Sequence, residues 1–326
     1  MTTPLLSVRN VVQEFTARGR GGVKGGVVHA VSDVSFDLAT GETLGVVGET
    51  GSGKSTLARS ILQAPRPKSG EVYFQGEDLM RRRSRGLTEA RRQLQMVFQD
   101  PYGSLNPRWR VSEIVAEPLV GYRAGNRESR VRELLDLVGL NPDSYARRRP
   151  HELSGGQCQR VAIARAIALD PALVVCDEAV SSLDVLIQAQ VLNLFERLRR
   201  ELGLSYLFIS HDLALVKQVS DRVAVMHLGQ LCEIGPAEAL YRAPLHPYTV
   251  ALLSSIPKLE PGAARDAEPV PLRGEPPSPI SPPSGCRFRT RCPFARDRCA
   301  AEAPVLRELA PGHSVACHFP MMSDEQ

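Results

Sequence analysis

The sequence predicts an α/β fold in which a sheet of mainly parallel strands is covered by helices. Short apolar segments alternate with segments of helical periodicity between residues 43 and 219, and this alternation is typical of strands joined by crossover helices. Residues 43–47 form an apolar strand that leads into a glycine-rich turn and then a helix. With 43% hydrophobic and 23% charged residues among 326, the chain can bury a large core and is not globally disordered.

The elements are expected in a regular order. Helical spacing of Val131, Leu134, Leu135 and Val138 predicts that residues 111–149 are helical. The other expected strands are 5–8, 34–38, 43–47, a hairpin from residue 69, 95–98, 173–176 and 205–210, and the other expected helices are 55–63, 157–169, 185–202 and 213–219.

Composition divides the chain into three parts. Residues 1–256 are expected to form one large domain, with a glycine-rich loop at 19–26. Residues 257–284 hold nine of the 25 prolines and are predicted to be a linker. Residues 285–320, which hold four of the seven cysteines, are predicted to form a small C-terminal unit, called here the cysteine module.

Several classes of protein are disfavoured by composition. No apolar run approaches the ~18 residues of a membrane helix, and the first residues lack the pattern of a secretory signal, so a cytosolic location is expected. The net charge of +4 is weaker than is usual for a nucleic-acid-binding protein. Seven cysteines are too few for a disulfide scaffold at this length.

A phosphate-binding loop follows the strand at 43–47. The segment matches G-x-x-x-x-G-K-[ST] at every fixed position, between a strand and a helix as the motif requires. Glycines let backbone N–H groups surround phosphate oxygens, and the helix N-terminus favours the same anion. The residues are Gly48, Glu49, Thr50, Gly51, Ser52, Gly53, Lys54 and Ser55, followed by Thr56. Lys54 is expected to reach the β- and γ-phosphates, and Ser55 to bind Mg²⁺.

A pair of acidic residues ends a second apolar strand, 173–176. Asp177 is expected to take part in Mg²⁺ binding, because an acid at the end of a buried strand beside a phosphate loop commonly does so. Glu178 is placed to polarise an attacking water. Without the phosphate loop, such a pair would be only the solvated end of a strand.

The sequence Leu153-Ser154-Gly155-Gly156-Gln157, together with the two motifs above, resembles the ATP-binding-cassette (ABC) ATPases. LSGGQ is the signature of that family, so the resemblance implies an ABC cassette of the P-loop NTPase fold. Residues 1–256 would be its nucleotide-binding domain, with a mixed sheet and a helical subdomain at about 101–155. The resemblance also implies that residues Ser154–Gln157 contact ATP.

Further family elements appear in the expected order. Gln99 matches the Q-loop, and Asp184 matches the loop that crosses the dimer interface in this family. His211, after the strand at 205–210, matches the switch histidine. Phe15 is the candidate for stacking on adenine. The alternative is that Phe15 is a core residue of its strand. The resemblance therefore implies that Glu178, His211 and Gln99 are catalytic residues. It also implies that Ser55, Gln99 and Asp177 bind Mg²⁺.

Three longer segments narrow the resemblance to the ATPases of dipeptide, oligopeptide and nickel importers, and toward the second of their two ATPases. They are 98–107 (FQDPYGSLNP), 176–184 (CDEAVSSLD) and 245–249 (LHPYT). Cys158 departs from the family, which more often has a polar or basic residue there. The alternative class, ABC-type ATPases of nucleic-acid maintenance, usually carries long coiled coils between its motifs, and no sustained heptads occur here.

The resemblance implies a mechanism and a set of partners. Two ATPase subunits, expected to be paralogues, would pack head to tail with ATP between the phosphate loop of one and the signature of the other. Hydrolysis would drive transport through two transmembrane permease subunits, which receive substrate from an extracytoplasmic substrate-binding protein. No nucleic-acid partner is expected. The chain would then lie peripherally on the cytoplasmic face of the inner membrane.

Cys286, Cys292, Cys299 and Cys317 are spaced x₅, x₆ and x₁₇ apart, which is not a C-x₂-C zinc pattern. Three interpretations remain open: a [4Fe–4S] cluster, a structural Zn²⁺, or cysteines of a small packed tail that are reduced or form disulfides after purification. The family resemblance favours the cluster.

Overall fold

The computed structural model describes residues 3–17, 25–255 and 274–321. Most of the predicted glycine-rich loop (19–24) and of the predicted proline-rich linker (257–273) therefore lies outside the described residues. The chain divides into two compact units, each built from separated segments. The helical unit comprises Met1–Leu5, Leu38–Thr43 and Arg81–Ile209, and the sheet unit comprises Leu6–Asp37, Leu44–Met80 and Ser210–Gln326.

Three parallel strands form the core of the helical unit. Strand β7 (Leu173–Asp177) pairs in parallel with β6 (Leu94–Val97) on one side and β8 (Ser205–Ser210) on the other. All residues of β7 and β8 are buried, as expected for parallel strands covered on both faces. Phe195 of α8 (Val185–Leu202) packs edge-on against Tyr206 and Phe208 of β8, with ring centroids 5.4 and 5.9 Å away.

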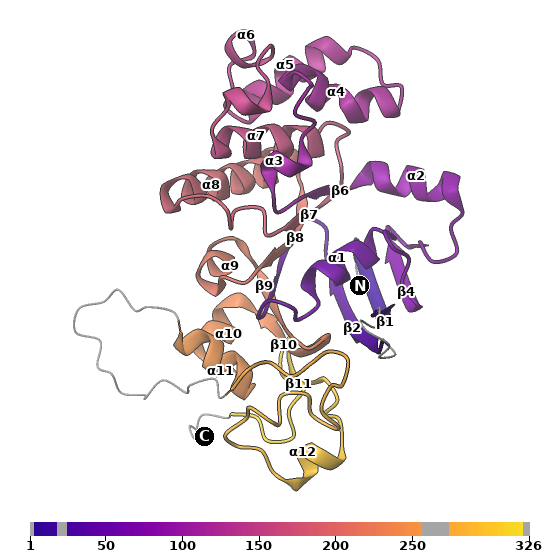
Figure 1. Cartoon of the computed structure of the whole chain (residues 1–326), viewed down its shortest axis with the longest axis vertical. Coiled ribbons are helices and arrows are strands. Elements are labelled where there is room, and N and C mark those ends of the chain that lie inside the picture. The colour runs from indigo at the N-terminus through magenta and orange to yellow at the C-terminus, as the bar shows by residue number, and fades with distance from the viewer. Residues whose placement is uncertain (1–2, 18–24, 256–273, 322–326) are drawn as a thin grey trace, which may run out of the picture. The chain divides into compact units, whose positions relative to one another are not determined.

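The predicted helical region consists of short helices packed on α7 (Gly155–Ala166), seen in magenta in Figure 1. They are α3 (Pro101–Ser104), α4 (Val111–Gly121), α5 (Arg127–Leu137), α6 (Pro142–Tyr145) and the 3₁₀ turn η1 (Pro150–Glu152). Val131, Leu134 and Leu135 of α5 are buried, so the helical spacing read from the sequence marks a true core face.

Helix α2 (Ser84–Gln93) was not predicted from the sequence, and neither were the strands and helices that follow residue 219. Helix α2 lies in the segment expected to hold only a hairpin and a strand, and none of its residues is buried. Leu87 is its one large apolar residue, so the repeated apolar positions by which a helix is recognised in a sequence are missing.

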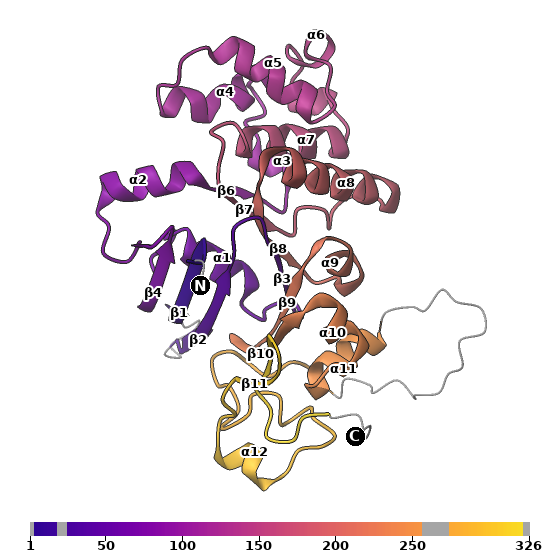
Figure 2. The same cartoon turned by 180° about the vertical axis from the view of Figure 1, so that it is seen from behind.

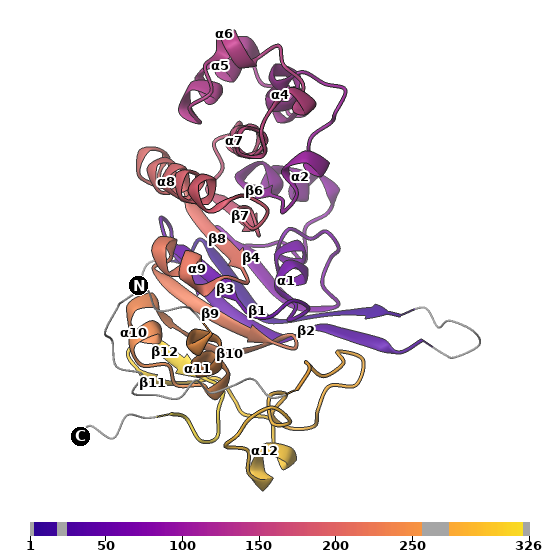
Figure 3. The same ribbon diagram turned by 60° about the vertical axis from the view of Figure 1, so that its left-hand side comes forward.

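An antiparallel sheet begins the sheet unit, with strand order β2-β1-β4-β5. Its members are β1 (Leu6–Thr16), β2 (Val27–Leu38), β4 (Ser69–Phe74) and β5 (Glu77–Asp78). Figure 3 shows β1 and β2 running beside each other. Both are longer than the predicted strands at 5–8 and 34–38. Asn10 and Asp33, both with positive φ, interrupt the apolar alternation, which continues beyond them at the buried residues Val11 and Val31.

A second group of strands in the sheet unit leads into the phosphate loop. Strand β3 (Thr43–Val47) pairs in parallel with β9 (Arg222–His227), which pairs antiparallel with β10 (Gln230–Pro236). The cysteine module extends this group, since β12 (His313–Val315) pairs with β10 and β11 (Arg307–Ala310) pairs with β12. The module thus shares a sheet with the strand that precedes the phosphate loop.

Five helices complete the sheet unit: α1 (Lys54–Ile61), α9 (Leu213–Val219), α10 (Ala237–Arg242), α11 (Pro247–Ser254) and α12 (Asp297–Ala301). Helices α10 and α11 both contact β10, as Figure 2 shows from behind. Within the described ranges, no helix has the length and hydropathy that crossing a membrane requires. The predicted mixed α/β architecture is confirmed, and the strand 205–210 and helices 185–202 and 213–219 have the predicted bounds.

Candidate functional site

The phosphate loop lies between β3 and α1, as predicted. Gly48 and Gly53 have φ values of 153° and 103°, in the region that favours glycine. A Cβ at Gly48 would lie 2.2 Å from the Met226 carbonyl oxygen, and one at Gly53 would lie 2.1 Å from that of Ala30. Glycine is therefore required at both positions by conformation and by the close approach of backbone.

The polar groups of this loop suit an anionic ligand. Lys54 is 4% exposed, and its Nζ donates to the carbonyl oxygens of Gly48 (2.7 Å) and Glu49 (3.1 Å). The Ser52 hydroxyl is buried and has no hydrogen-bond partner among the described residues. A buried cation, an unsatisfied hydroxyl and the N-terminus of α1 together fit phosphate oxygens. Thr50 and Gly51 are exposed, and Ser55 and Thr56 are half-buried in the first turn of α1.

Glu49 is held by two residues that the sequence analysis did not assign to the site. Its carboxylate accepts two hydrogen bonds from the Arg291 guanidinium, at 2.6 and 3.0 Å. Its backbone N–H donates to the Tyr248 hydroxyl at 3.0 Å. Burial acts to raise the pKa of Glu49, but the hydrogen bonds and charge of Arg291 outweigh it, so the pKa lies below its usual value. Tyr248 falls in the segment 245–249 that carried the family resemblance, whereas nothing in the pattern singled out Arg291.

In the helical unit, the predicted acidic pair ends β7. Asp177 is 4% exposed, and Glu178 has a left-handed φ of 49°, which is rare for a residue with a side chain. The Glu178 N–H donates to the Ile209 carbonyl (2.9 Å), and its carbonyl accepts from Ser181 N–H (3.2 Å). These bonds hold Glu178 in a conformation that costs about 1–3 kcal/mol, which is common at functional sites.

Gln99 and Glu178 are brought together. The Nε2 of Gln99 donates to Oε2 of Glu178 at 2.8 Å, within the helical unit. This bond leaves Oε1 of Gln99 as the amide atom suited to a cation. Carboxylate, amide and hydroxyl oxygens, as in Asp177, Gln99 and Ser55, are the ligand types that Mg²⁺ prefers.

The LSGGQ segment begins α7 with a capping box. The Ser154 hydroxyl accepts from Gln157 N–H at 3.3 Å, and the Gln157 side chain accepts from Ser154 N–H at 3.0 Å. A Cβ on Gly156 would lie 2.5 Å from a methyl group of Ile187, so a larger residue would not fit against α8. Cys158 is fully buried, and burial raises its pKa to about 11. This departure from the family is therefore a core residue of the helical unit.

The remaining predicted residues occupy exposed or capping positions. Asp184 is the N-cap of α8 and accepts from Ile187 N–H at 3.1 Å. In the sheet unit, His211 is exposed between β8 and α9. Phe15 of β1 is 41% exposed, so the alternative that it is a strand core residue is wrong.

The four cysteines of the module gather around one cavity of about 10 Å³. Burial raises the pKa of Cys286 and Cys292, and that of Cys317 to about 11, so these thiols carry protons at neutral pH. The volume is about that of one water position. Among the described residues, no three His, Cys, Asp or Glu side chains are arranged to hold a metal ion. In this arrangement the thiols pack together, so binding a cluster or Zn²⁺ would require them to deprotonate and move apart.

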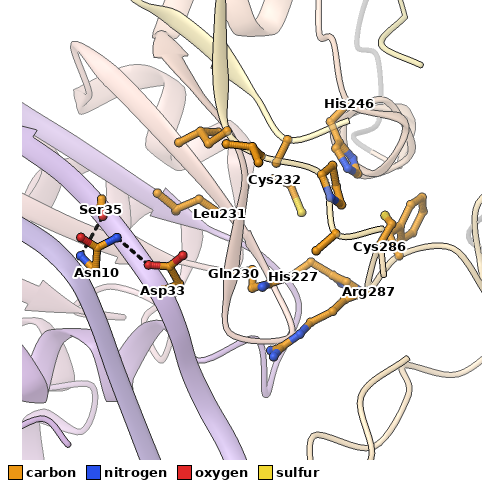
Figure 4. A pocket seen from close by; sticks show the side chains of 16 residues that line it. Asn10, Asp33, Ser35, His227, Gln230, Leu231, Cys232, His246, Cys286 and Arg287 are labelled. Carbon is orange, nitrogen blue, oxygen red and sulfur yellow. Dashed lines mark hydrogen bonds between the residues drawn. The ribbon is translucent and has the colours of Figure 1, made fainter. Parts of the chain in front are cut away.

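A larger cavity of about 380 Å³ lies in the sheet unit. Figure 4 shows Asn10 bonded to Asp33 on one side of it and His227 and Arg287 on the other. Burial lowers the pKa of His227 to about 4, and its Nε2 has no hydrogen-bond partner in the described part of the chain. Of the predicted site residues, Cys286 lines this cavity.

Comparison with protein families is consistent with this geometry. The family described as "ABC transporter" matches residues 31–181. A second family, "Oligopeptide/dipeptide transporter, C-terminal region", matches residues 232–299.

Individual proteins match over most of the chain. The oligopeptide transport ATP-binding protein AppF of Bacillus subtilis (strain 168) is 49% identical over 320 residues, which are 97% of this chain and 97% of that protein. A solved dimeric structure of the ATP-binding cassette MJ0796, in a post-hydrolysis state bound to ADP and Pi, is 28% identical. It has a TM-score of 0.63 and covers 71% of this chain and 98% of its own.

Proposed function

The chain belongs to the ATP-binding subunits of ABC peptide transporters, and from this membership we propose that it hydrolyses ATP to energise the import of di- or oligopeptides or related cargo. The observation that carries the proposal is the phosphate loop between β3 and α1, with Lys54 buried in it and Gln99 bonded to Glu178 elsewhere in the same chain. These are the groups that phosphoryl transfer to water requires.

We assign Glu178 as the general base that takes a proton from the attacking water. Its carboxylate is held by Gln99, and its backbone by the bonds to Ile209 and Ser181. His211 would orient the water and the γ-phosphate. Bound Mg²⁺, held by Ser55, Asp177 and Gln99, would neutralise charge that develops on the phosphate oxygens.

We infer head-to-tail pairing with a second ABC ATPase subunit, a paralogue, so that ATP lies between one phosphate loop and the partner's LSGGQ. Ser154 and Gly155 at the start of α7 offer N–H groups and a positive helix end to a γ-phosphate. Asp184 is followed by Val185 and Leu186, whose side chains are 78% and 77% exposed. Apolar side chains this exposed favour a protein contact beside Asp184.

We infer that the helical unit contacts the permease subunits. Phe98, Tyr102 and Trp109, which follow or flank Gln99, are 43%, 46% and 38% exposed. An exposed aromatic group next to a catalytic glutamine is suited to transmit nucleotide state to a partner. The chain would then lie on the cytoplasmic face of the membrane, with two permeases and an extracytoplasmic binding protein completing the importer.

Reconstitution tests this function. The chain, its paralogue and both permeases in liposomes should hydrolyse ATP and take up peptide only when the loaded binding protein is present. Hydrolysis that is stimulated by DNA and not by the loaded binding protein would support the alternative, a nucleic-acid maintenance ATPase, and would overturn the proposal.

For the cysteine module, metal binding stays a prediction that rests on residue type and on the four thiols facing one cavity. A [4Fe–4S] cluster is preferred to Zn²⁺, and either would require the thiols to deprotonate and move apart. Anaerobic purification followed by assay of iron, zinc and acid-labile sulfide is the test. Protein free of all three would leave packed, reduced cysteines.

A further inference from the structure

Glu49, in the phosphate loop, is contacted by groups from two segments far along the chain. Its carboxylate binds the guanidinium of Arg291, 242 residues away, and its N–H binds the hydroxyl of Tyr248, 199 residues away. Its carbonyl oxygen accepts from Lys54. All four residues belong to the sheet unit. Every polar group of Glu49 is thus occupied, and two of the three partners come from outside the phosphate-loop motif.

The Arg291–Glu49 ion pair has the geometry of a strong ion pair. It is bidentate, with Nη1 to Oε2 at 2.6 Å and Nη2 to Oε1 at 3.0 Å. The Arg291 side chain is 4% exposed and that of Glu49 is 24% exposed. Water therefore screens this pair much less than a surface pair, and removing one partner would leave a charge buried without its counterpart.

Arg291 is itself fixed by a tight turn and an aromatic cluster. Its backbone N–H donates to the Phe288 carbonyl at 3.0 Å. The Phe288 ring packs against Tyr248 and His227, with centroids 5.2 and 5.4 Å away. Tyr248 packs on the Phe288 ring and Arg291 is bonded to the Phe288 backbone, so both groups that hold Glu49 are anchored at the same residue.

The position of Glu49 also affects Lys54, through the backbone carbonyl groups of the loop. Lys54 Nζ lies against the carbonyl oxygens of Gly48 and Glu49, so the orientation of the peptide groups at residues 48 and 49 sets where this ammonium rests. A shift of Glu49 would move the groups that cradle phosphate, because they are consecutive in a short loop.

We propose that Arg291 is a positioning residue: through its ion pair with Glu49, the cysteine module sets the conformation of the phosphate loop and hence the affinity for ATP. The inference rests on the proposed function, since it takes the loop to bind ATP. Arg291 acts on the nucleotide only through Glu49. Loss of the pair should therefore raise the KM for ATP much more than it lowers kcat.

The test uses the full chain and four variants: Arg291→Ala, Arg291→Lys, Glu49→Gln and the double variant R291A/E49Q. Arg298→Ala is the matched control, because Arg298 lies in the same module but pairs with Glu302 at the surface. The Kd for ATP, the KM and kcat of hydrolysis and the unfolding temperature are measured for each. The double variant removes both charges, so it leaves no unpaired buried ion if R291A folds poorly.

Arg291→Ala and Glu49→Gln should each raise the Kd and KM for ATP about tenfold, the scale of a lost charged hydrogen bond. The double variant should be no worse than either single variant, Arg291→Lys should recover part of the loss, and R298A should match the wild type. An effect of R291A within about twofold, additive effects in the double variant, or an equal loss in R298A would overturn the inference. Wild-type protein that does not bind ATP would overturn the proposed function as well, which separates the two failures.

Discussion

The side-chain amide of Gln99 donates a hydrogen bond to the Glu178 carboxylate across 2.8 Å, joining residues 79 apart in the chain. Glu178 is held on its other side by backbone bonds that keep its φ positive. The amide that donates to this carboxylate fixes its direction, which a general base needs.

Replacing Glu178 with Gln should therefore preserve ATP binding and reduce turnover by about 10²–10⁴-fold, the usual contribution of a general base. The variant should accumulate an ATP-bound dimer, detectable by size-exclusion chromatography with Mg²⁺-ATP. Glu201→Gln, at an exposed position of α8, is the matched control and should hydrolyse ATP normally. Near-normal turnover by E178Q would remove Glu178 from the role of base.

Lys54 provides a second prediction, on binding. Lys54→Ala removes the buried ammonium that lies over the loop carbonyls, so ATP affinity should fall by about 100-fold or more, as expected for a lost charged contact with phosphate. Lys68→Ala, which removes an exposed lysine of the same unit, should leave the Kd unchanged. Isothermal titration with ATP is the measurement, and equal affinity in the two variants would contradict the assignment.

Ser154 combines a structural and a catalytic role that two variants can separate. Ser154→Ala removes the cap of α7 and should lower the free energy of unfolding by about 1 kcal/mol, measured by urea denaturation. Ser154→Asp keeps a capping acceptor, so stability should recover. Its added negative charge at the ATP contact should still abolish hydrolysis. If S154D hydrolyses ATP like the wild type, Ser154 is only a cap.

Buried histidines predict a pH dependence of stability. Burial lowers the pKa of His246, and also that of His227, to about 4, against 6.5 for an ordinary histidine. Nearby Glu233 acts against this shift at His246, as Glu49 does at His227. Between pH 6.5 and 4 the unfolded chain binds protons that the folded chain does not. Stability is therefore full above pH 6.5 and falls by about 1.4 kcal/mol per pH unit for each histidine below it.

His246→Asn tests this dependence. Asn retains an acceptor for the Tyr248 N–H that His246 Nδ1 now caps at 3.0 Å, but it does not titrate. Urea unfolding at pH 4.5, 5.5, 6.5 and 7.5 should show a shallower acid limb in the variant. Parallel curves for the variant and the wild type would show that His246 is not kept neutral by the fold.

Most elements with a strong local pattern were predicted up to residue 219, whereas the buried strands β9 and β10 and the helices α10 and α11 beyond it were not. Helix α8 and strand β8 have the predicted bounds because apolar periodicity runs through their whole length. Helix α2 was missed because it buries nothing. The strands β1 and β2 were predicted too short, because Asn10 and Asp33, both with positive φ, interrupt the apolar alternation that continues at Val11 and Val31.

By itself, the sequence determined the local chemistry of the protein. The phosphate loop could be recognised because its strand, glycines, lysine and helix are consecutive, and short-range geometry alone positions them. The acidic pair and the helix cap at Ser154 are local for the same reason.

Only the tertiary structure decided which distant groups act on these motifs. The Gln99–Glu178 bond depends on the pairing of β6 with β7, and the Arg291–Glu49 pair depends on the cysteine module joining the sheet that carries the phosphate loop. The sequence around an arginine does not indicate which acidic residue it will pair with. The partner is chosen by packing between segments 242 residues apart, which no spacing rule encodes.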